Sequence, residues 1–280
     1  MKFGVNTFLW TVEFGAKDLP LLPRLKAGGF DGFEVAIFDA TRFAAAEIRR
    51  GCAENDLECT VCSVIPQGLS IGHEDTGARR KTVSHLKACI AAVADAGARL
   101  LAGPLYTPVG WLPGRRRTGD EWARAVDSYR ELGPVLAAHG VTLAIEPLNR
   151  FETYFLNTAA DAARLCDEVA HPAVGVLFDT FHANIEEKDL AAGYRTVARH
   201  LRHVHTCEND RGTPGSGHVP WSAVFGALRE TGYDGWLTIE SFGSRITEIA
   251  NAAAIWRDLA GSADEIAFEG VKFLRRSWSS

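Results

Sequence analysis

The segment VTLAIEPL, residues 141–148, decides the fold of this 280-residue chain. Apolar and β-branched residues run from Val141 to Ile145 without a break, and Glu146 follows them at once. A run that is apolar throughout, rather than at every second position, is typical of a parallel strand buried on both faces. The segment therefore predicts a buried parallel strand with a carboxylate at its end.

Seven further runs of this kind occur along the chain. They cover residues 2–8, 30–37, 59–65, 99–105, 174–180, 201–207 and 235–242. Segments with helical spacing separate them, such as SYRELGPVLAAHG at 128–140, and several end in a glycine, the residue that commonly follows a helix C-terminus. Eight strand–helix units predict a single α/β domain over residues 1–280, a (β/α)8 TIM barrel, a fold that needs about 250 residues.

Two loops and a tail exceed the minimal barrel. The segments after the third and fourth strands, 66–77 and 106–122, are long, and long loops at that end of a barrel commonly carry the site or a lid. The tail at 262–280 has a helical pattern and forms an extra C-terminal helix. We expect it to pack across the bottom of the barrel or against a second subunit.

Composition narrows the function classes. The net charge of -5 and the pI of about 6.0 argue against nucleic acid as a partner, and the basic run 115–117 is interpreted as a solvated loop. No stretch reaches the roughly eighteen apolar residues of a membrane helix, and the N-terminus turns polar too soon for a signal peptide. We therefore expect a cytoplasmic protein whose six cysteines are reduced.

Four polar residues stand at the ends of the last four predicted strands. They are Glu146, Asp179, His205 and Glu240, each about thirty residues from the next, which is one strand plus one returning helix. One such residue would be an ordinary polar strand terminus, but four in step indicate a common site. Three carboxylates that converge need a cation, and oxygen-rich ligation favours Mn²⁺, Mg²⁺ or Co²⁺ over structural zinc.

A second set of polar residues follows the first at short offsets. Glu152 lies six residues past Glu146, His182 three past Asp179, and Arg211 six past His205. Each taken singly would be a surface loop residue. As a group they would surround the opening of the pocket, where Arg and His donate to substrate oxygens and a glutamate accepts from a hydroxyl.

Three long stretches carry a resemblance to a known family: NRFETYFLNTAADA at 149–162, FDTFHANIEE at 178–187 and HVHTCENDRGTPGSGHVPW at 203–221. With IWRDL at 255–259 they resemble the ketose 3-epimerases (the D-tagatose and D-psicose 3-epimerase group) of the sugar phosphate isomerase/epimerase superfamily, which has the xylose isomerase-like barrel. The resemblance implies metal binding by Glu146, Asp179, His205 and Glu240. It also implies sugar contacts by Glu152, His182 and Arg211.

The match is weaker in the N-terminal half. Glu34 resembles a family glutamate that either contacts the substrate or holds a ligand from behind, against the alternative of an ordinary strand-end residue. Trp111 in the long fourth loop is a candidate wall for the sugar, or packs only within its loop. His203 shares a strand face with His205 and either orients it or belongs to the core.

The resemblance further implies inversion at carbon 3 of a free ketose through an enediolate, with Glu146 and Glu240 as the acid/base pair and Mn²⁺ as the foremost metal. No phosphate-binding glycine motif is present, which favours a free sugar. The alternatives are an aldose–ketose or hydroxypyruvate isomerase on the same barrel and, in another class, a non-catalytic sugar-binding barrel. We expect a homodimer or homotetramer.

Overall fold

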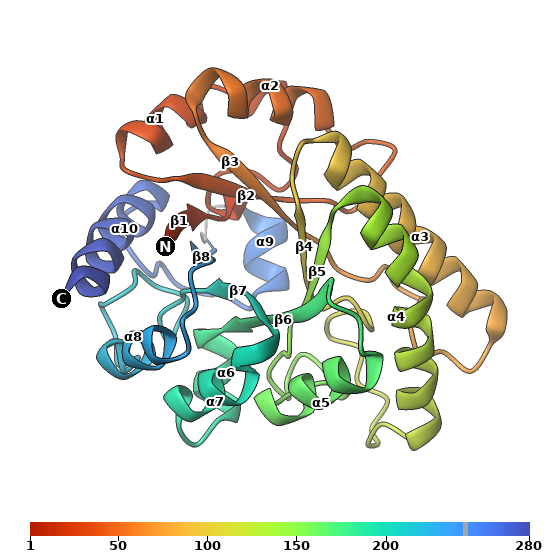
Figure 1. Ribbon diagram of the computed structural model, residues 1–280. Helices are drawn as coiled ribbons and strands as arrows, with labels where there is room; N and C mark the ends of the chain where they lie inside the picture. Colours follow the sequence, from red (N-terminus) through yellow and green to blue (C-terminus); the bar gives the residue numbers. More distant parts are fainter. Residues whose placement is uncertain (243–245) are drawn as a thin grey trace.

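The computed structural model describes residues 1–242 and 246–280. Eight strands run parallel in the order β1-β8-β7-β6-β5-β4-β3-β2 and form a nearly closed barrel with helices around it (Figure 1). The strands are β1 (Lys2–Val5), β2 (Gly32–Ala36), β3 (Glu58–Cys62), β4 (Leu100–Gly103), β5 (Thr142–Ile145), β6 (Val174–Asp179), β7 (Leu201–His205) and β8 (Trp236–Ile239). The predicted TIM barrel is confirmed.

Helices connect the strands and cover their outer faces. They are α1 (Leu21–Ala27), α2 (Ala45–Asn55), α3 (Thr76–Asp95), α4 (Gly119–His139), α5 (Ala159–Val169), α6 (Thr180–Glu186), α7 (Leu190–Val197), α8 (Trp221–Glu230), α9 (Thr247–Ala252) and α10 (Ala263–Ser279). Short 3-10 turns occur at η1 (Thr7–Leu9), η2 (Ala16–Asp18) and η3 (Ala198–His200).

Local sequence signals set the ends of the long helix α4. Thr118 caps its N-terminus and accepts from the backbone N–H of Glu121, whose carboxylate accepts from the N–H of Thr118 in return. This reciprocal capping box satisfies two backbone donors that the helix leaves free. Gly140 ends α4 with φ 62, a left-handed conformation that glycine adopts without steric cost.

The core lies in two layers that follow the alternation of side chains along the strands. A small cluster of Leu100, Ala102, Ala144 and Leu177 is separate from the large cluster, which includes Leu143, Ile145 and Phe178 and packs strands against helices. Since alternate residues of a strand face the same side, Glu146 shares the side of Ala144 and Asp179 that of Leu177. Both carboxylates therefore point into the barrel.

The first and second strands close the barrel through side chains as well as backbone. A bridge joins Asn6, just past β1, to Glu34 of β2. Asn6 Nδ2 donates to Glu34 Oε1 at 3.0 Å, and Thr7 Oγ1 donates to the backbone oxygen of Glu34 at 3.0 Å. Glu34 thus lies in the barrel wall between β1 and β2, where a single bridge replaces the longer backbone pairing of the other neighbouring strands.

The predicted C-terminal helix is present as α10, but it does not lie across the bottom of the barrel. It packs on the outer side against α8, β1 and β8, where it covers the seam between the first and last strands (Figure 1). Arg275 anchors it through a 2.8 Å hydrogen bond to the backbone oxygen of Gly29 and a 2.8 Å ion pair with Asp31. The helix α9 lies between β8 and α10 in the chain, and α10 is the additional C-terminal helix predicted from the sequence.

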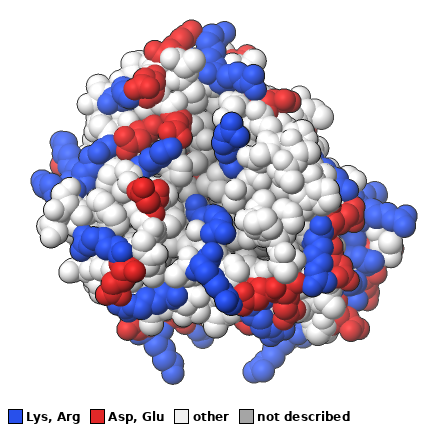
Figure 2. Space-filling view, in the orientation of Figure 1, with Lys and Arg blue, Asp and Glu red and all other residues white. Residues whose placement is uncertain are grey.

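The surface seen in Figure 2 carries Lys and Arg side chains interspersed with Asp and Glu rather than one broad stripe of either sign. Among the described residues, none of the helices combines the length and the apolar character needed to cross a membrane.

Candidate active site

Four side chains meet at the carboxyl ends of neighbouring strands. Glu146 directly follows β5, Asp179 ends β6, His205 ends β7 and Glu240 directly follows β8. Asp179 and His205 are also register partners in the ladder between β6 and β7. One carboxylate oxygen or imidazole nitrogen of each residue lies within 4.8 Å of the corresponding atoms of the other three. The structure therefore brings together the four residues predicted from their spacing.

This cluster fits a divalent cation by its donor chemistry. All four side chains are buried, and neither Glu146 Oε1 nor His205 Nδ1 has a hydrogen-bond partner among the described residues. A buried acceptor without a partner costs about 1–3 kcal/mol unless something else satisfies it. Three carboxylate oxygens and one imidazole nitrogen are ligands that suit hard divalent ions.

The electrostatics of the cluster also favour an added positive charge. Burial and the nearby Glu240 raise the pKa of Glu146 well above its ordinary value, and burial raises the pKa of Asp179 against the charge of Arg211. Burial opposes the ionisation of Glu240 too, but the charges of His205 and Arg211 outweigh it and lower its pKa to about 2. A cation at this point would favour the ionised form of all three carboxylates.

Arg211 lies directly against the carboxylates rather than at the outer rim. Its Nη1 donates to Asp179 Oδ2 at 2.8 Å and to Glu240 Oε2 at 2.7 Å, and its guanidinium lies 4.1 Å from the ring centre of Phe181. Its backbone has φ 67, which costs a non-glycine residue roughly 1–2 kcal/mol. Two hydrogen bonds hold that conformation. Ser241 Oγ donates to the backbone oxygen of Arg211, and the backbone N–H of Arg211 donates to the backbone oxygen of Glu208 at 3.0 Å.

His182 and Glu152 are both held by Asn149. The backbone N–H of Asn149 donates to His182 Nδ1 at 3.1 Å, and its side-chain Nδ2 donates to Glu152 Oε1 at 2.8 Å. His182 Nε2 lies 3.7 Å from Glu146 Oε1 and 3.1 Å from Arg211 Nη2, so this nitrogen faces the same space as the carboxylates. Burial and Arg211 lower the pKa of His182, which keeps it neutral.

Glu34 lies behind His205 and not beside the substrate space. Its Oε1 lies 2.8 Å from His205 Nε2 and accepts from Asn6, while Thr60 Oγ1 donates to its Oε2 at 2.9 Å. His203 Nε2 is 2.9 Å from the same Oε2 but lacks hydrogen-bond geometry. The side chain is fully buried. A substrate contact by Glu34 stays a prediction, and this geometry favours the alternative in which Glu34 holds a ligand from behind.

A cavity of about 280 Å³ opens directly above the cluster. Its polar floor is formed by Glu146, Glu152, His182, Arg211 and Glu240. Its walls are mainly apolar, with Glu248 as a charged member, and they include Phe8, Val12, Phe38, Val64, Pro104, Val109, Leu148, Phe242, Ile249, Ala252 and Ala253. A polar floor under apolar walls can fix one end of a small polar ligand and leave the other end loosely held.

Trp111 is not among the described residues that line this cavity. It is 39% exposed and its ring packs edge-on against Tyr154 with 5.3 Å between ring centres. The Trp111 ring packs against a residue of the loop after β5, away from the described lining of this cavity, and a sugar contact by Trp111 stays a prediction. Phe8 and Phe242 line the walls.

Sequence reasoning missed Glu208, which organises the loop that carries Arg211. Its carboxylate is fully buried and accepts from the backbone N–H groups of Gly215 at 2.7 Å and Val219 at 2.8 Å, and from Trp221 Nε1 at 2.9 Å. The sequence does contain an indication of this role. Glu208 lies in the stretch 203–221, within a glycine-rich loop whose backbone N–H groups need acceptors.

The comparisons with known proteins agree with this architecture. Residues 22–276 match the model of the xylose isomerase-like TIM barrel family, and the chain belongs to that family. A probable ketose 3-epimerase of Synechocystis sp. is 37% identical over 280 residues, covering 100% of this chain and 98% of the relative. A D-psicose 3-epimerase of Ruminiclostridium cellulolyticum is 31% identical over 270 residues, covering 95% and 92%. The structure of a D-allulose 3-epimerase from Methylomonas sp. in complex with D-allulose superposes with a TM-score of 0.93 at 26% identity, covering 99% and 97%.

Proposed function

We propose that the chain is a divalent-metal-dependent ketose 3-epimerase that inverts carbon 3 of free ketoses. The observation that carries the proposal is the convergence of Glu146, Asp179, His205 and Glu240 beneath one cavity, where Glu146 Oε1 and His205 Nδ1 lack other hydrogen-bond partners among the described residues. The relatives are named as epimerases of ketoses, which supports the substrate class.

The reaction needs an acidic proton and an oxygen that can accept negative charge. The hydrogen on carbon 3 is acidic because carbon 2 is a carbonyl. A divalent ion held by the four ligands, with Mn²⁺ foremost and Co²⁺ or Mg²⁺ as alternatives, would supply a Lewis acid for that carbonyl. The chain itself must supply the proton transfers.

Two glutamates suit proton transfer on opposite faces of the substrate. Glu146 and Glu240 follow β5 and β8, which lie three strands apart around the barrel. One carboxylate takes the proton from carbon 3 as the C–H bond breaks, and the electron pair moves toward carbon 2 to give a planar enediolate. The other, protonated, returns a proton to carbon 3 from the far side, which restores the carbonyl and inverts the centre.

The remaining polar floor would orient the carbonyl end of the sugar. Arg211 and His182 would contact substrate oxygens, and Glu152 would accept from a hydroxyl. Because Asn149 holds both His182 and Glu152, these two contacts move together. The apolar walls leave carbons 4–6 with few polar partners, so several ketoses would fit.

An aldose–ketose isomerase would instead take the proton from carbon 1 and return it to carbon 2 through the 1,2-enediolate. A sugar-binding barrel would leave carbon 3 untouched. The test incubates the protein, stripped of metal and then loaded with Mn²⁺, Co²⁺ or Mg²⁺, with a panel of ketoses in heavy water. We expect metal-dependent formation of the carbon-3 epimer with deuterium at carbon 3. Aldose products would favour the isomerase, and binding without exchange would favour the non-catalytic barrel.

A further inference from the structure

A second cavity lies beside the one above the carboxylates, at the same end of the barrel. It has a volume of about 730 Å³, within the roughly 300–1,000 Å³ of small-molecule sites. Its described lining comes from the loop after β1, from the end of β2 and the loop that follows it, and from Ile246 and Glu248 near α9. None of the proposed ligands or sugar contacts lines it, so it does no work in the reaction proposed above.

The two cavities adjoin each other. Val12, Phe38 and Glu248 line both of them, and they therefore form the boundary between the two spaces. The polar floor that would hold carbons 1–3 lies in the first cavity. A ketose bound in that direction has its apolar-walled end, carbons 4–6, free to point toward the boundary and the second cavity.

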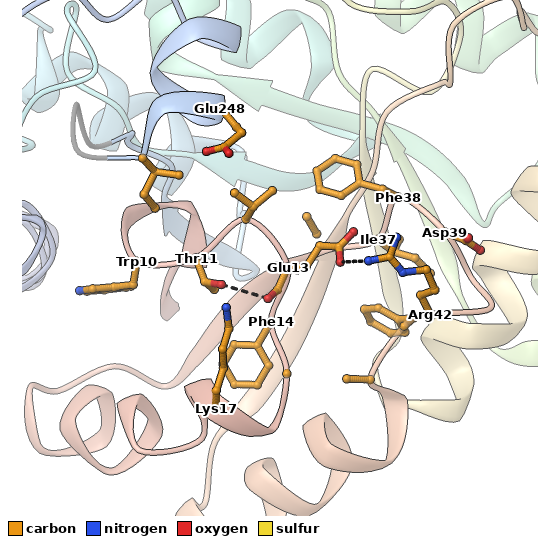
Figure 3. A pocket seen from close by; sticks show the side chains of 16 residues that line it. Trp10, Thr11, Glu13, Phe14, Lys17, Ile37, Phe38, Asp39, Arg42 and Glu248 are labelled. Atoms are coloured by element: carbon orange, nitrogen blue, oxygen red, sulfur yellow. Dashed lines mark hydrogen bonds and ion pairs between the residues drawn. The ribbon is translucent and has the colours of Figure 1, made fainter.

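The second cavity has the character of a site for a neutral polyol. Its base is apolar and buried, formed by Phe14, Ala36 and Ile37. Figure 3 shows Glu13 and Arg42 meeting between the two loops, joined at 2.9 Å, with Phe38 and Glu248 above them. A sugar ring offers C–H groups to an apolar base and hydroxyls to charged side chains of both signs, so this combination suits it.

The ion pair between Glu13 and Arg42 contributes little to the stability of the fold, so a ligand can take over its hydrogen bonds at small cost. Its side chains are 48% and 67% exposed, and exposed pairs of this kind contribute about 0–1 kcal/mol to stability. Both groups can hydrogen-bond vicinal hydroxyls, the carboxylate as acceptor and the guanidinium as donor.

We propose that this cavity is a second sugar subsite, which receives a glycosyl group attached to the terminal oxygen of the ketose. The inference rests on the proposed function, since it assumes that a ketose lies over the carboxylates with carbon 1 at the polar floor. The chain then acts on ketoses extended at carbon 6 as well as on free hexuloses.

The test compares D-fructose with isomaltulose, which is D-fructose carrying glucose on its terminal oxygen and keeps a carbonyl at carbon 2. The metal-loaded protein is assayed for inversion and proton exchange at carbon 3 in both. Fructose with glucose on oxygen 1 serves as the direction control, since the closed polar floor leaves no room there. We expect turnover of D-fructose and isomaltulose but not of the 1-linked sugar.

A large side chain at position Gly15 would narrow the second cavity and leave the first cavity unchanged. It lines only the second cavity, and a Cβ placed on it would meet no atom within 4 Å. Gly15→Trp should lower kcat/KM for isomaltulose by about 10-fold or more, in line with steric discrimination by pockets, and that for D-fructose by less than about 3-fold. Arg42→Ala should lower the isomaltulose value by about 5- to 10-fold. Gly226→Trp, on the outer helix α8 where a Cβ is equally unobstructed, is the matched control and should change neither.

The outcomes separate the two proposals. Turnover of D-fructose without turnover of isomaltulose, or equal turnover of both linkages, would overturn the subsite and leave the epimerase standing. Full isomaltulose activity in Gly15→Trp and Arg42→Ala would show that the glucose lies elsewhere. Absence of reaction with every ketose would count against the proposed function itself.

Discussion

Glu34 Oε1 lies 2.8 Å from His205 Nε2, and this contact determines which nitrogen of His205 faces the other three candidate ligands. With Nε2 turned to a carboxylate, the proton resides there and Nδ1 offers its lone pair to the cluster, 3.4 Å from Glu240 Oε2. Burial opposes the ionisation of Glu34, but the charges of His205 and His203 outweigh it and hold its pKa well below the ordinary value. A carboxylate behind a ligating imidazole fixes its tautomer and orientation.

Glu34→Gln should therefore weaken Mn²⁺ binding by about 10- to 100-fold, the usual effect of losing the partner behind a metal ligand. Titration calorimetry of the metal-free protein measures this directly, and the nitrogen shifts of His205 report its tautomer without reference to activity. Glu58→Gln, an exposed glutamate on the neighbouring strand β3, is the control and should bind metal as the unaltered protein does. Unchanged affinity and tautomer in Glu34→Gln would remove Glu34 from this role.

Glu208 should act on the substrate through the loop that carries Arg211. In the unaltered protein, N–H groups of this loop donate to the Glu208 carboxylate. Glu208→Gln places an amide group, itself a donor, next to these N–H groups, so we expect a loss of about 1–3 kcal/mol in the free energy of unfolding. Because Arg211 is positioned by this loop, KM should rise more than kcat falls. Arg257→Ala breaks the exposed pair with Asp210 on the same loop and should change neither quantity. Unaltered KM in a folded Glu208→Gln protein would separate Glu208 from Arg211.

Arg211→Ala should impair the substrate step and spare the metal. All four candidate ligands remain, and the two carboxylates that now accept from Arg211 stay in place. We expect a higher KM or a lower kcat. Atomic emission should find the same metal content in the variant as in the unaltered protein. If the purified variant loses its metal, Arg211 belongs with the groups that hold the ion.

Glu121 provides a pH-dependent test of the fold away from the site. Its hydrogen bonds from Arg115 lower its pKa to about 2, with further help from the Thr118 N–H. A carboxylate whose folded pKa lies below the unfolded value of about 4.3 stabilises the fold above that pH and loses the effect as pH falls toward 2.

Glu121→Gln should therefore cost about 1–2 kcal/mol at pH 7, from the capping box and its ion pair, and the difference should shrink between about pH 4.5 and 2. Urea unfolding at several pH values measures it. Asp120→Asn, exposed in the same first turn, should show a smaller cost. A cost that stays constant down to pH 2 would contradict this account of Glu121.

The sequence predicted the four clustered residues because strand alternation and barrel topology determine where strand ends meet. Once 141–148 and its counterparts are parallel strands, Glu146 and the residues in step with it must converge. Two partners of Glu34 could not be predicted. His205 reaches it from β7 across the barrel, and Asn6 reaches it through a single bridge between β1 and β2, and neither contact follows a periodic pattern. The side that Trp111 faces could not be predicted either, because a long loop has no periodicity that tells where its aromatic ring points.

The position of α10 shows the same limit. The pattern at 262–280 predicted the helix, and α10 spans Ala263–Ser279. Its place depends on Arg275 and on the short α9 that precedes it, neither of which marks a docking site in sequence.

The proposed transfer of protons by Glu146 and Glu240 on opposite faces of one enediolate can be tested by solvent exchange and inversion at carbon 3. Glu146→Gln and Glu240→Gln are each assayed with both epimers of one ketose. Glutamine keeps an oxygen for the metal but removes the titratable carboxylate, so inversion should fall by about 100- to 10,000-fold in each variant. We expect exchange without inversion for one epimer in one variant and for the opposite epimer in the other. Inversion of both epimers at near the original rate in both metal-loaded variants would rule out proton transfer by these two glutamates.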